Sequence, residues 1–140
     1  MSIESNSSQL VIRNALLASR LSKRVGNHLS VHGISLTEYL VMHYLAHSPH
    51  AAVPRIELAE HIGMSASGIT RLMAPMEKIG VIEKLASLRD ARQSLVKLSD
   101  AGQRLYSEAS ISFEHSANDL VGNLSAGQQE KIVELFGKLV

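Results

Sequence analysis

The stretch PRIELAEHIGMSASGITRLMAPMEKIG, residues 54–80, decides the fold of this chain. Pro54 suits the first position of a short helix over residues 55–62. A turn at Gly63-Met64-Ser65 follows, and its serine is a good N-cap for a second helix. Two short helices joined by such a turn are typical of a helix-turn-helix motif. The second helix is expected to bury Ile69, Leu72, Met73 and Met76.

The periodicity of the sequence changes after Gly80. Residues 81–85 and 93–98 resemble short strands, and the polar, basic segment 86–92 between them is typical of a hairpin loop. A hairpin that directly follows a helix-turn-helix forms its wing. We therefore expect a mainly α fold with a small β-hairpin wing, built around a winged helix-turn-helix core.

The segments on both sides of this core have the pattern of amphipathic helices. One runs from about residue 9 to 32, and the next, capped by Ser35 or Thr37, runs to about 47. After the hairpin, one helix begins at Ser99-Asp100 and another at Ser125. The apolar stripes at both ends are more than a small core can cover, so they predict a homodimer. The expected organisation is one domain, 1–140, with a DNA-binding core at about 36–98 and dimerisation helices at about 8–33 and 100–140.

Composition excludes several classes of function. The 140 residues include no cysteine, so disulfides, thiol catalysis and thiolate metal sites are ruled out. No apolar run reaches the roughly 18 residues of a membrane helix, and the amino-terminal segment does not have the pattern of a signal peptide. A cytoplasmic protein without a membrane partner is expected. Neither a glycine-rich phosphate loop nor a hydrolytic metal motif is present, so the sequence does not predict an enzyme.

Charge gathers in the region of the second helix and the wing. The chain as a whole carries +1, whereas residues 71–97 hold six Lys or Arg against three Asp or Glu. Short hydroxyls and guanidinium groups on an exposed helix suit base edges and phosphates, and a helix N-terminus attracts a phosphate. The candidate DNA-binding residues are Ser65, Ser67, Thr70, Arg71, Lys78, Arg89, Asp90 and Arg92.

Residues 56–82 resemble the core of the MarR family of transcriptional regulators. Asp90-Ala91-Arg92 resembles the Asp-x-Arg wing motif of that family, and Leu98-Ser99-Asp100-Ala101-Gly102 resembles the Leu-Thr-x-x-Gly that begins its next helix. The ordered set extends over about residues 10–140. The resemblance implies a homodimer in which each subunit places one recognition helix in the major groove and one wing in the minor groove. It also implies that Arg92 reaches the minor groove, with Arg89 as a second basic contact, and that Asp90 helps to hold the wing.

The family also implies a pocket for a small-molecule effector between the dimerisation helices and the winged core. By position, its candidate residues are His28, His32, Tyr39 and His43. These groups suit an aromatic or anionic organic molecule, because they can donate hydrogen bonds to a carboxylate. The expected function is a repressor that such a ligand releases from a pseudo-palindromic operator in double-stranded DNA, with no metal and no other cofactor.

The sequence leaves two alternative functions open and contains one irregularity in the expected recognition helix. Two pairs of histidines four residues apart, His28 with His32 and His43 with His47, have spacing that suits a divalent metal, so a metal-responsive regulator of the same fold is one alternative. A winged-helix protein-interaction module without DNA binding is another. Pro75 lies inside the expected recognition helix, where it removes a hydrogen bond and predicts a kink before Lys78.

Overall fold

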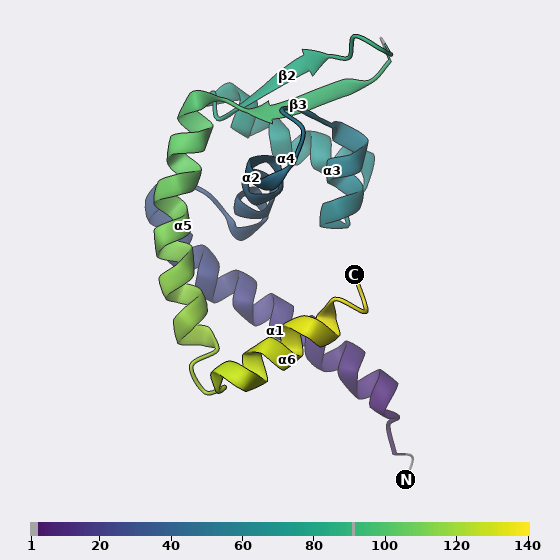
Figure 1. Cartoon of the computed structure of the whole chain (residues 1–140), viewed down its shortest axis with the longest axis vertical. Helices are drawn as coiled ribbons and strands as arrows, with labels where there is room; N and C mark the ends of the chain where they lie inside the picture. Colours follow the sequence, from purple (N-terminus) through teal and green to yellow (C-terminus); the bar gives the residue numbers. More distant parts are fainter. Residues whose placement is uncertain (1–2, 91) are drawn as a thin grey trace.

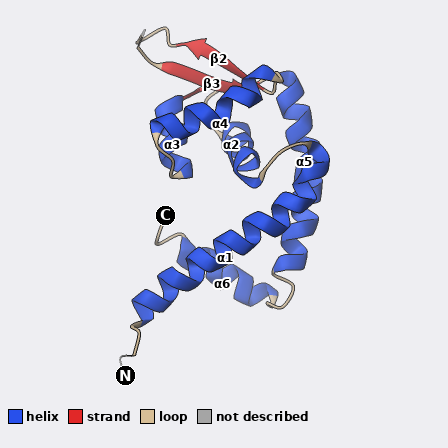
Figure 2. Cartoon of the chain, turned by 180° about the vertical axis from the view of Figure 1, so that it is seen from behind, coloured by secondary structure: helices blue, strands red, loops and turns tan. Residues whose placement is uncertain are grey.

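A computed structural model of the chain describes residues 3–90 and 92–140. A winged core lies apart from the terminal helices, and the long helix α5 connects the two regions (Figures 1 and 2). Among the residues described, no helix is both long and apolar enough to cross a membrane. In chain order the elements are α1 (Asn6–Leu29), the 3₁₀ helix η1 (Ser30–His32), α2 (Leu36–His47), β1 (Val53–Pro54), α3 (Arg55–Ile62), α4 (Ala66–Lys78), β2 (Ile82–Ala86), β3 (Ser94–Leu98), α5 (Asp100–Leu120) and α6 (Ala126–Phe136).

Serine residues define where most of these helices begin. In each case the hydroxyl oxygen accepts a hydrogen bond from a backbone N–H three residues later, which satisfies one of the free donors of the first turn. The predicted start of α6 at Ser125 is confirmed, and this serine forms a capping box with Gln128. Ser35, rather than Thr37, caps α2 and forms a capping box with Glu38. Within the described chain, the serine N-caps are Ser5, Ser35, Ser65, Ser99 and Ser125.

Three sequence predictions need correction. The first helix begins at Asn6 rather than near residue 9, and its expected last turn is the separate 3₁₀ helix. Pro54 is the N-cap of α3 and not its first residue. The sheet has a third strand, because Val53 pairs with Val96 and Pro54 pairs with Leu95, so the order is β1-β3-β2. Proline is tolerated in β1 because this strand lies at the edge of the sheet.

The hydrophobic core lies between the sheet and helices α2 to α5. The helix-turn-helix turn itself requires a left-handed residue, which Gly63 supplies with φ of 76°. The predicted buried face of α4 is confirmed for Ile69, Met73 and Met76, while Leu72 is half-buried. These side chains share the core with Val41 and Met42 of α2, Leu58 of α3 and Val96 of β3.

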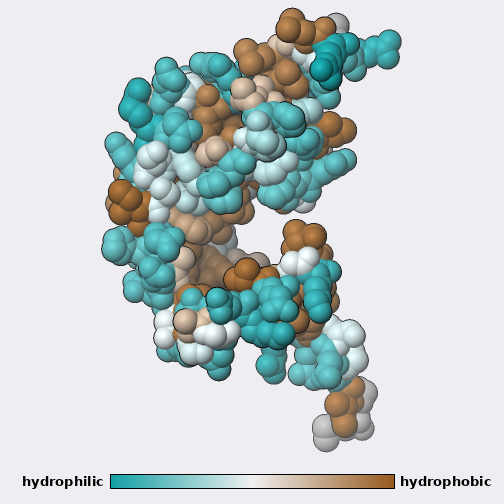
Figure 3. Space-filling model, viewed as in Figure 1, coloured by the Kyte–Doolittle hydropathy of each residue, from teal (hydrophilic) through white to brown (hydrophobic). Residues whose placement is uncertain are grey.

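The terminal helices contribute little to this core. Only Val25 and Leu29 of α1 are buried, and no residue of α6 is buried. Apolar side chains are therefore visible among polar ones on the lower part of the molecule (Figure 3). The exposed apolar residues of these two helices and the following tail are Leu10, Val11, Ile12, Leu16, Leu17, Ile132, Val133, Leu135, Phe136, Leu139 and Val140.

Candidate nucleic-acid interface

Helix α4 presents a polar face opposite its buried one. Ser65 caps the helix by accepting the N–H of Gly68 at 3.0 Å, and the Ser67 hydroxyl lies 3.3 Å from that of Ser65. The Thr70 hydroxyl donates to the carbonyl of Ala66 at 2.9 Å, which leaves its oxygen free to accept a further hydrogen bond. The structure places all the predicted contact residues of α4 at the surface, namely Ser65, Ser67, Thr70, Arg71 and Lys78.

Pro75 does not end the helix. Helix α4 is assigned without interruption from Ala66 to Lys78, and the proline itself is exposed. Because Pro75 has no N–H, the carbonyl of Arg71 loses its usual partner within the helix. Arg71 and Pro75 are both exposed, so water can hydrate the free carbonyl.

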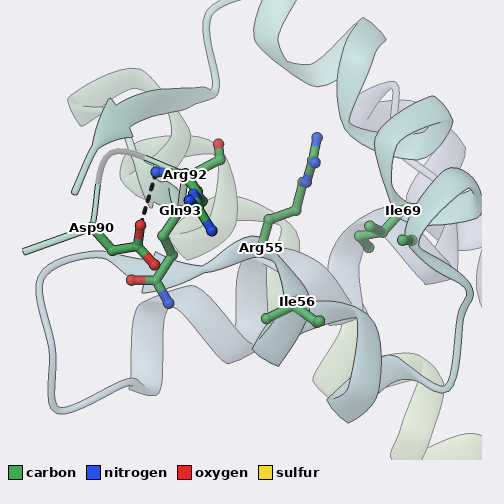
Figure 4. Close-up of a pocket in the computed structure, with 8 residues that line it drawn as sticks. Arg55, Ile56, Ile69, Asp90, Arg92 and Gln93 are labelled. Carbon is green, nitrogen blue, oxygen red and sulfur yellow. Dashed lines mark hydrogen bonds between the residues drawn. The ribbon is translucent and has the colours of Figure 1, made fainter.

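The wing loop is folded by its own polar groups. The Ser87 hydroxyl accepts the backbone N–H groups of Arg89 and Asp90, each at 3.2 Å. The Asp90 carboxylate then accepts the backbone N–H of Arg92 at 2.9 Å, the contact drawn as a dashed line in Figure 4. The Asp90 side chain therefore shapes the loop, while the Arg89 and Arg92 side chains remain exposed. Ala91 lies outside the described residues.

Ion pairs separate the basic residues of this region into two groups. Lys84 pairs with Glu77 and Lys97 pairs with Glu83, both at 3.4 Å. Within residues 3–90 and 92–140, no carboxylate lies within ion-pair distance of the other cations of this region. The cations without an ion-pair partner are Arg55, Arg71, Lys78, Arg89 and Arg92. The positive surplus therefore lies mainly on arginines of α3, α4 and the wing.

Arg55 is a candidate that was not predicted from the sequence. It lies in a hollow of about 310 Å³ between the start of α3, the start of α4 and the wing (Figure 4). The position of Arg55 follows from the pairing of β1 with β3, which was not predicted, so no local signal pointed to it. The lining consists of Arg55, Ile56, Ala66, Ile69, Asp90, Arg92, Gln93 and Ser94.

Two of the predicted effector residues connect the end of the first helical segment to α5. The Nδ1 atom of His28 lies 2.7 Å from the hydroxyl oxygen of Ser116, which is buried. The Nε2 atom of His32 lies 2.8 Å from the hydroxyl oxygen of Ser112. Each imidazole thus has one nitrogen engaged in a contact that joins α1 and η1 to α5.

Tyr39 belongs to an aromatic stack between α2 and α5. Its ring lies 4.4 Å from that of Phe113 and 5.4 Å from that of Tyr106, measured between centroids. Burial and the neighbouring Tyr106 hydroxyl raise the pKa of Tyr39 well above its usual value. Tyr106 is also buried.

His43 lies at the end of this stack. Its ring is 4.3 Å from that of His47, whose Nδ1 donates to the His43 carbonyl at 2.9 Å. Burial lowers the pKa of His43, and the nearby His47 and His61 lower it further. In the part of the chain that the structure describes, no three His, Asp or Glu side chains form a group suited to a metal ion.

In the part of the chain that the structure describes, the predicted effector residues lie in different surroundings. His28 lines a hollow with Ser116, whereas His43 lines another with His47 and His61. Tyr39 is buried in the core and lines neither of these two hollows.

The chain is therefore a winged helix-turn-helix protein. It has a helix-turn-helix, an exposed polar face on the second helix of that motif, and an adjacent wing. Residues 32–93 match the model of the MarR family. The matched residues cover most of the winged core, so this core is similar to that of MarR-family proteins.

Solved structures of this family share the fold along nearly the whole chain. A MarR-family regulator from Rhodococcus sp. RHA1 is 14% identical with a TM-score of 0.88, over 98% of this chain and 96% of that one. A MarR-family regulator from Streptomyces coelicolor, solved in complex with DNA, is 22% identical with a TM-score of 0.84, over 99% of this chain and 89% of that one. A mutant MarR from E. coli complexed with operator DNA is 18% identical with a TM-score of 0.81, over 98% and 99% of the two chains.

Proposed function

We propose that this chain is a transcriptional regulator that binds a pseudo-palindromic operator in double-stranded DNA as a homodimer, in the cytoplasm. The observation that carries this proposal is the group of unpaired arginines around the polar face of α4 and the adjacent wing. Two structural relatives were solved with DNA, which supports the same use of the fold here. A surface that bound only proteins would not need this concentration of free positive charge.

In this proposal, α4 enters the major groove and the wing enters the neighbouring minor groove. Arg71 and Thr70 face the base edges, where a guanidinium group recognises guanine and a hydroxyl accepts or donates a hydrogen bond. Ser65, Ser67 and Lys78 lie where they contact phosphates. Arg89 and Arg92 enter the negative potential of the minor groove, and Asp90 keeps the wing loop folded for this contact.

The homodimer covers the apolar faces of the terminal helices with a second copy of the same chain. In this arrangement about residues 36–98 form the DNA-binding core, and about 8–33 and 100–140 form the dimerisation region. Two recognition helices must meet major grooves roughly 34 Å apart, one turn of the duplex. A dimer fixes that spacing, which is why the operator is expected to be pseudo-palindromic.

The proposed mode of regulation is repression that a small aromatic or anionic molecule relieves. Such a ligand acts only if its affinity differs between the DNA-bound and free conformations. The aromatic stack of Tyr39, Tyr106 and Phe113, with His43 at its end, lies where the winged core meets α5. A ligand that separates these rings would change the orientation of α4 relative to the dimerisation helices.

The test begins with selection of bound sequences from a random pool of duplex DNA. Recovery of a pseudo-palindromic site that the protein binds well above random DNA supports the proposal, and equal affinity for all sequences contradicts it. Small aromatic acids and Zn²⁺ are then added separately to the complex. Release by an acid supports the organic effector, whereas release by Zn²⁺ that is lost in His43→Ala and His47→Ala would favour a metal-responsive regulator.

A further inference from the structure

The hollow between α4 and the wing lies where one strand of a bound DNA duplex would pass. If α4 lies in a major groove and the wing lies in the next minor groove, a sugar-phosphate strand must pass between them, because that strand separates the two grooves. The space between α4 and the wing is the hollow that Arg55 and Ile56 line from α3 (Figure 4). A phosphate of that strand therefore faces Arg55.

The backbone on both sides of this hollow is held in place. Arg55 directly follows Pro54, which pairs with Leu95 of β3, so the start of α3 is tied to one strand of the wing. Arg92 lies on the opposite side, where the Asp90 carboxylate accepts its backbone N–H. The two arginines reach the same space from segments that are distant in the sequence.

The charges in the hollow are not balanced by the protein. Asp90 is the one acidic residue of the lining, and its oxygen is engaged by the backbone of Arg92. In the described ranges, the guanidinium groups of Arg55 and Arg92 have no carboxylate oxygen within 4.0 Å. Two guanidinium groups that share one space repel each other, and an anion between them relieves that repulsion.

We infer that Arg55 binds a phosphate of the DNA backbone between the two grooves, with Arg92 facing the same strand from the wing. This inference rests on the proposed function, since it requires that α4 and the wing occupy adjacent grooves. Arg55 then positions the protein on the duplex without reading its sequence. Its contribution is equal for operator and random DNA, in contrast to that of Arg71.

The test compares Arg55→Ala with wild type. Binding to operator and to random duplex is titrated at several salt concentrations. The slope of log K against log salt is negative, and each lost phosphate contact reduces its magnitude by about 0.9. A dimer of Arg55→Ala loses one contact per subunit, so the magnitude of the slope falls by about 1.8. Affinity falls by about tenfold or more per half-site for both DNAs, because a hydrogen bond to a charged group is lost.

A second measurement identifies the phosphate. Operator duplexes are prepared with a neutral methylphosphonate at single positions. The substitution between the groove of the recognition helix and the groove of the wing should weaken binding by the wild-type protein. It should not weaken binding by Arg55→Ala any further. Arg55→Lys, which keeps the charge, should retain the salt slope and shows that a loss in Arg55→Ala is not a folding defect. The inference is overturned if the wild-type protein selects an operator and Arg55→Ala binds it with the same salt slope and the same affinity. Wild type that selects no operator refutes the proposed function instead.

Discussion

Gly102 provides the sharpest test of how the wing is attached to the rest of the molecule. It lies in the first turn of α5, and a Cβ atom built there would be 1.9 Å from the carbonyl oxygen of Val81. The same Cβ would lie 3.2 Å from a methyl group of Leu98. Ser99 donates its backbone N–H to that Val81 carbonyl at 3.1 Å, and its hydroxyl accepts the N–H of Gly102 at 3.0 Å. The start of α5 is thus fixed against the connection between α4 and β2.

The Gly102→Ala substitution sets two effects against each other. Alanine favours a helix by about 1 kcal/mol over glycine. Against this gain, a carbon atom 1.9 Å from a backbone oxygen forces two backbone segments apart, and overpacking of this kind costs about 1–3 kcal/mol. Separation also strains the two hydrogen bonds of Ser99, worth about 1 kcal/mol each. The expected net loss is about 2–4 kcal/mol of unfolding free energy, a large part of the roughly 5–15 kcal/mol of a typical domain.

Urea denaturation measures this loss, and Gly26→Ala serves as the control. Gly26 lies inside α1, and a Cβ there would meet no atom within 4 Å. That control should therefore gain up to about 1 kcal/mol from helix propensity alone. If Gly102→Ala were as stable as wild type or more stable, the close approach of α5 to Val81 would be wrong.

Three further substitutions test the proposed function and the protonation behaviour. Arg71→Ala should reduce the difference in binding free energy between operator and random DNA by about 1–3 kcal/mol in titrations with both duplexes. An equal loss of affinity for both duplexes would make Arg71 a phosphate contact. Phe136→Asp should convert the dimer to a monomer in sedimentation, because an unpaired buried charge costs several kcal/mol, and a monomeric wild type would contradict the dimer. The pKa of His43 is lowered in the folded chain, so as the pH falls the imidazole is protonated in the unfolded chain before it is protonated in the folded one. The free energy of unfolding should therefore fall as the pH drops below about 6.5. In urea titrations at pH 7 and pH 5, His43→Gln should show a smaller fall than wild type, and an equal fall would assign the effect to another group.

Local sequence signals were sufficient for much of this fold. A serine three residues before its partner N–H, or an apolar residue every third or fourth position, acts within one helix, so the caps at Ser65 and Ser125 and the face of Ile69 and Met73 could be predicted. Strand β1 could not be predicted, because it consists of two residues whose only support is a pairing with β3 across the intervening helix-turn-helix.

The candidate interface divides in the same way. Exposure of Thr70 and Arg71 follows from the helical period, and the sequence was enough to predict it. Counting charges showed a basic surplus but could not show that Lys84 and Lys97 are paired, since their partners lie on other elements. Arg55 enters the interface only through β1, so the full set of free cations required the tertiary structure.

Helix α5 joins the parts that a regulatory ligand would have to move. Its first turn is held at Val81, its middle is stacked on α2 through Tyr106 and Phe113, and Ser116 contacts His28 of α1. The winged core is therefore attached to the first turn and the middle of α5, and the amino-terminal helix to its second half. In the proposed mode of regulation, a ligand that opened the aromatic stack would change the tilt of the core on α5 and leave the dimerisation helices in place. In the proposed dimer this tilt determines the separation of the two α4 helices, so control of DNA binding would act through the contact of α2 with α5 and would not require α4 itself to change.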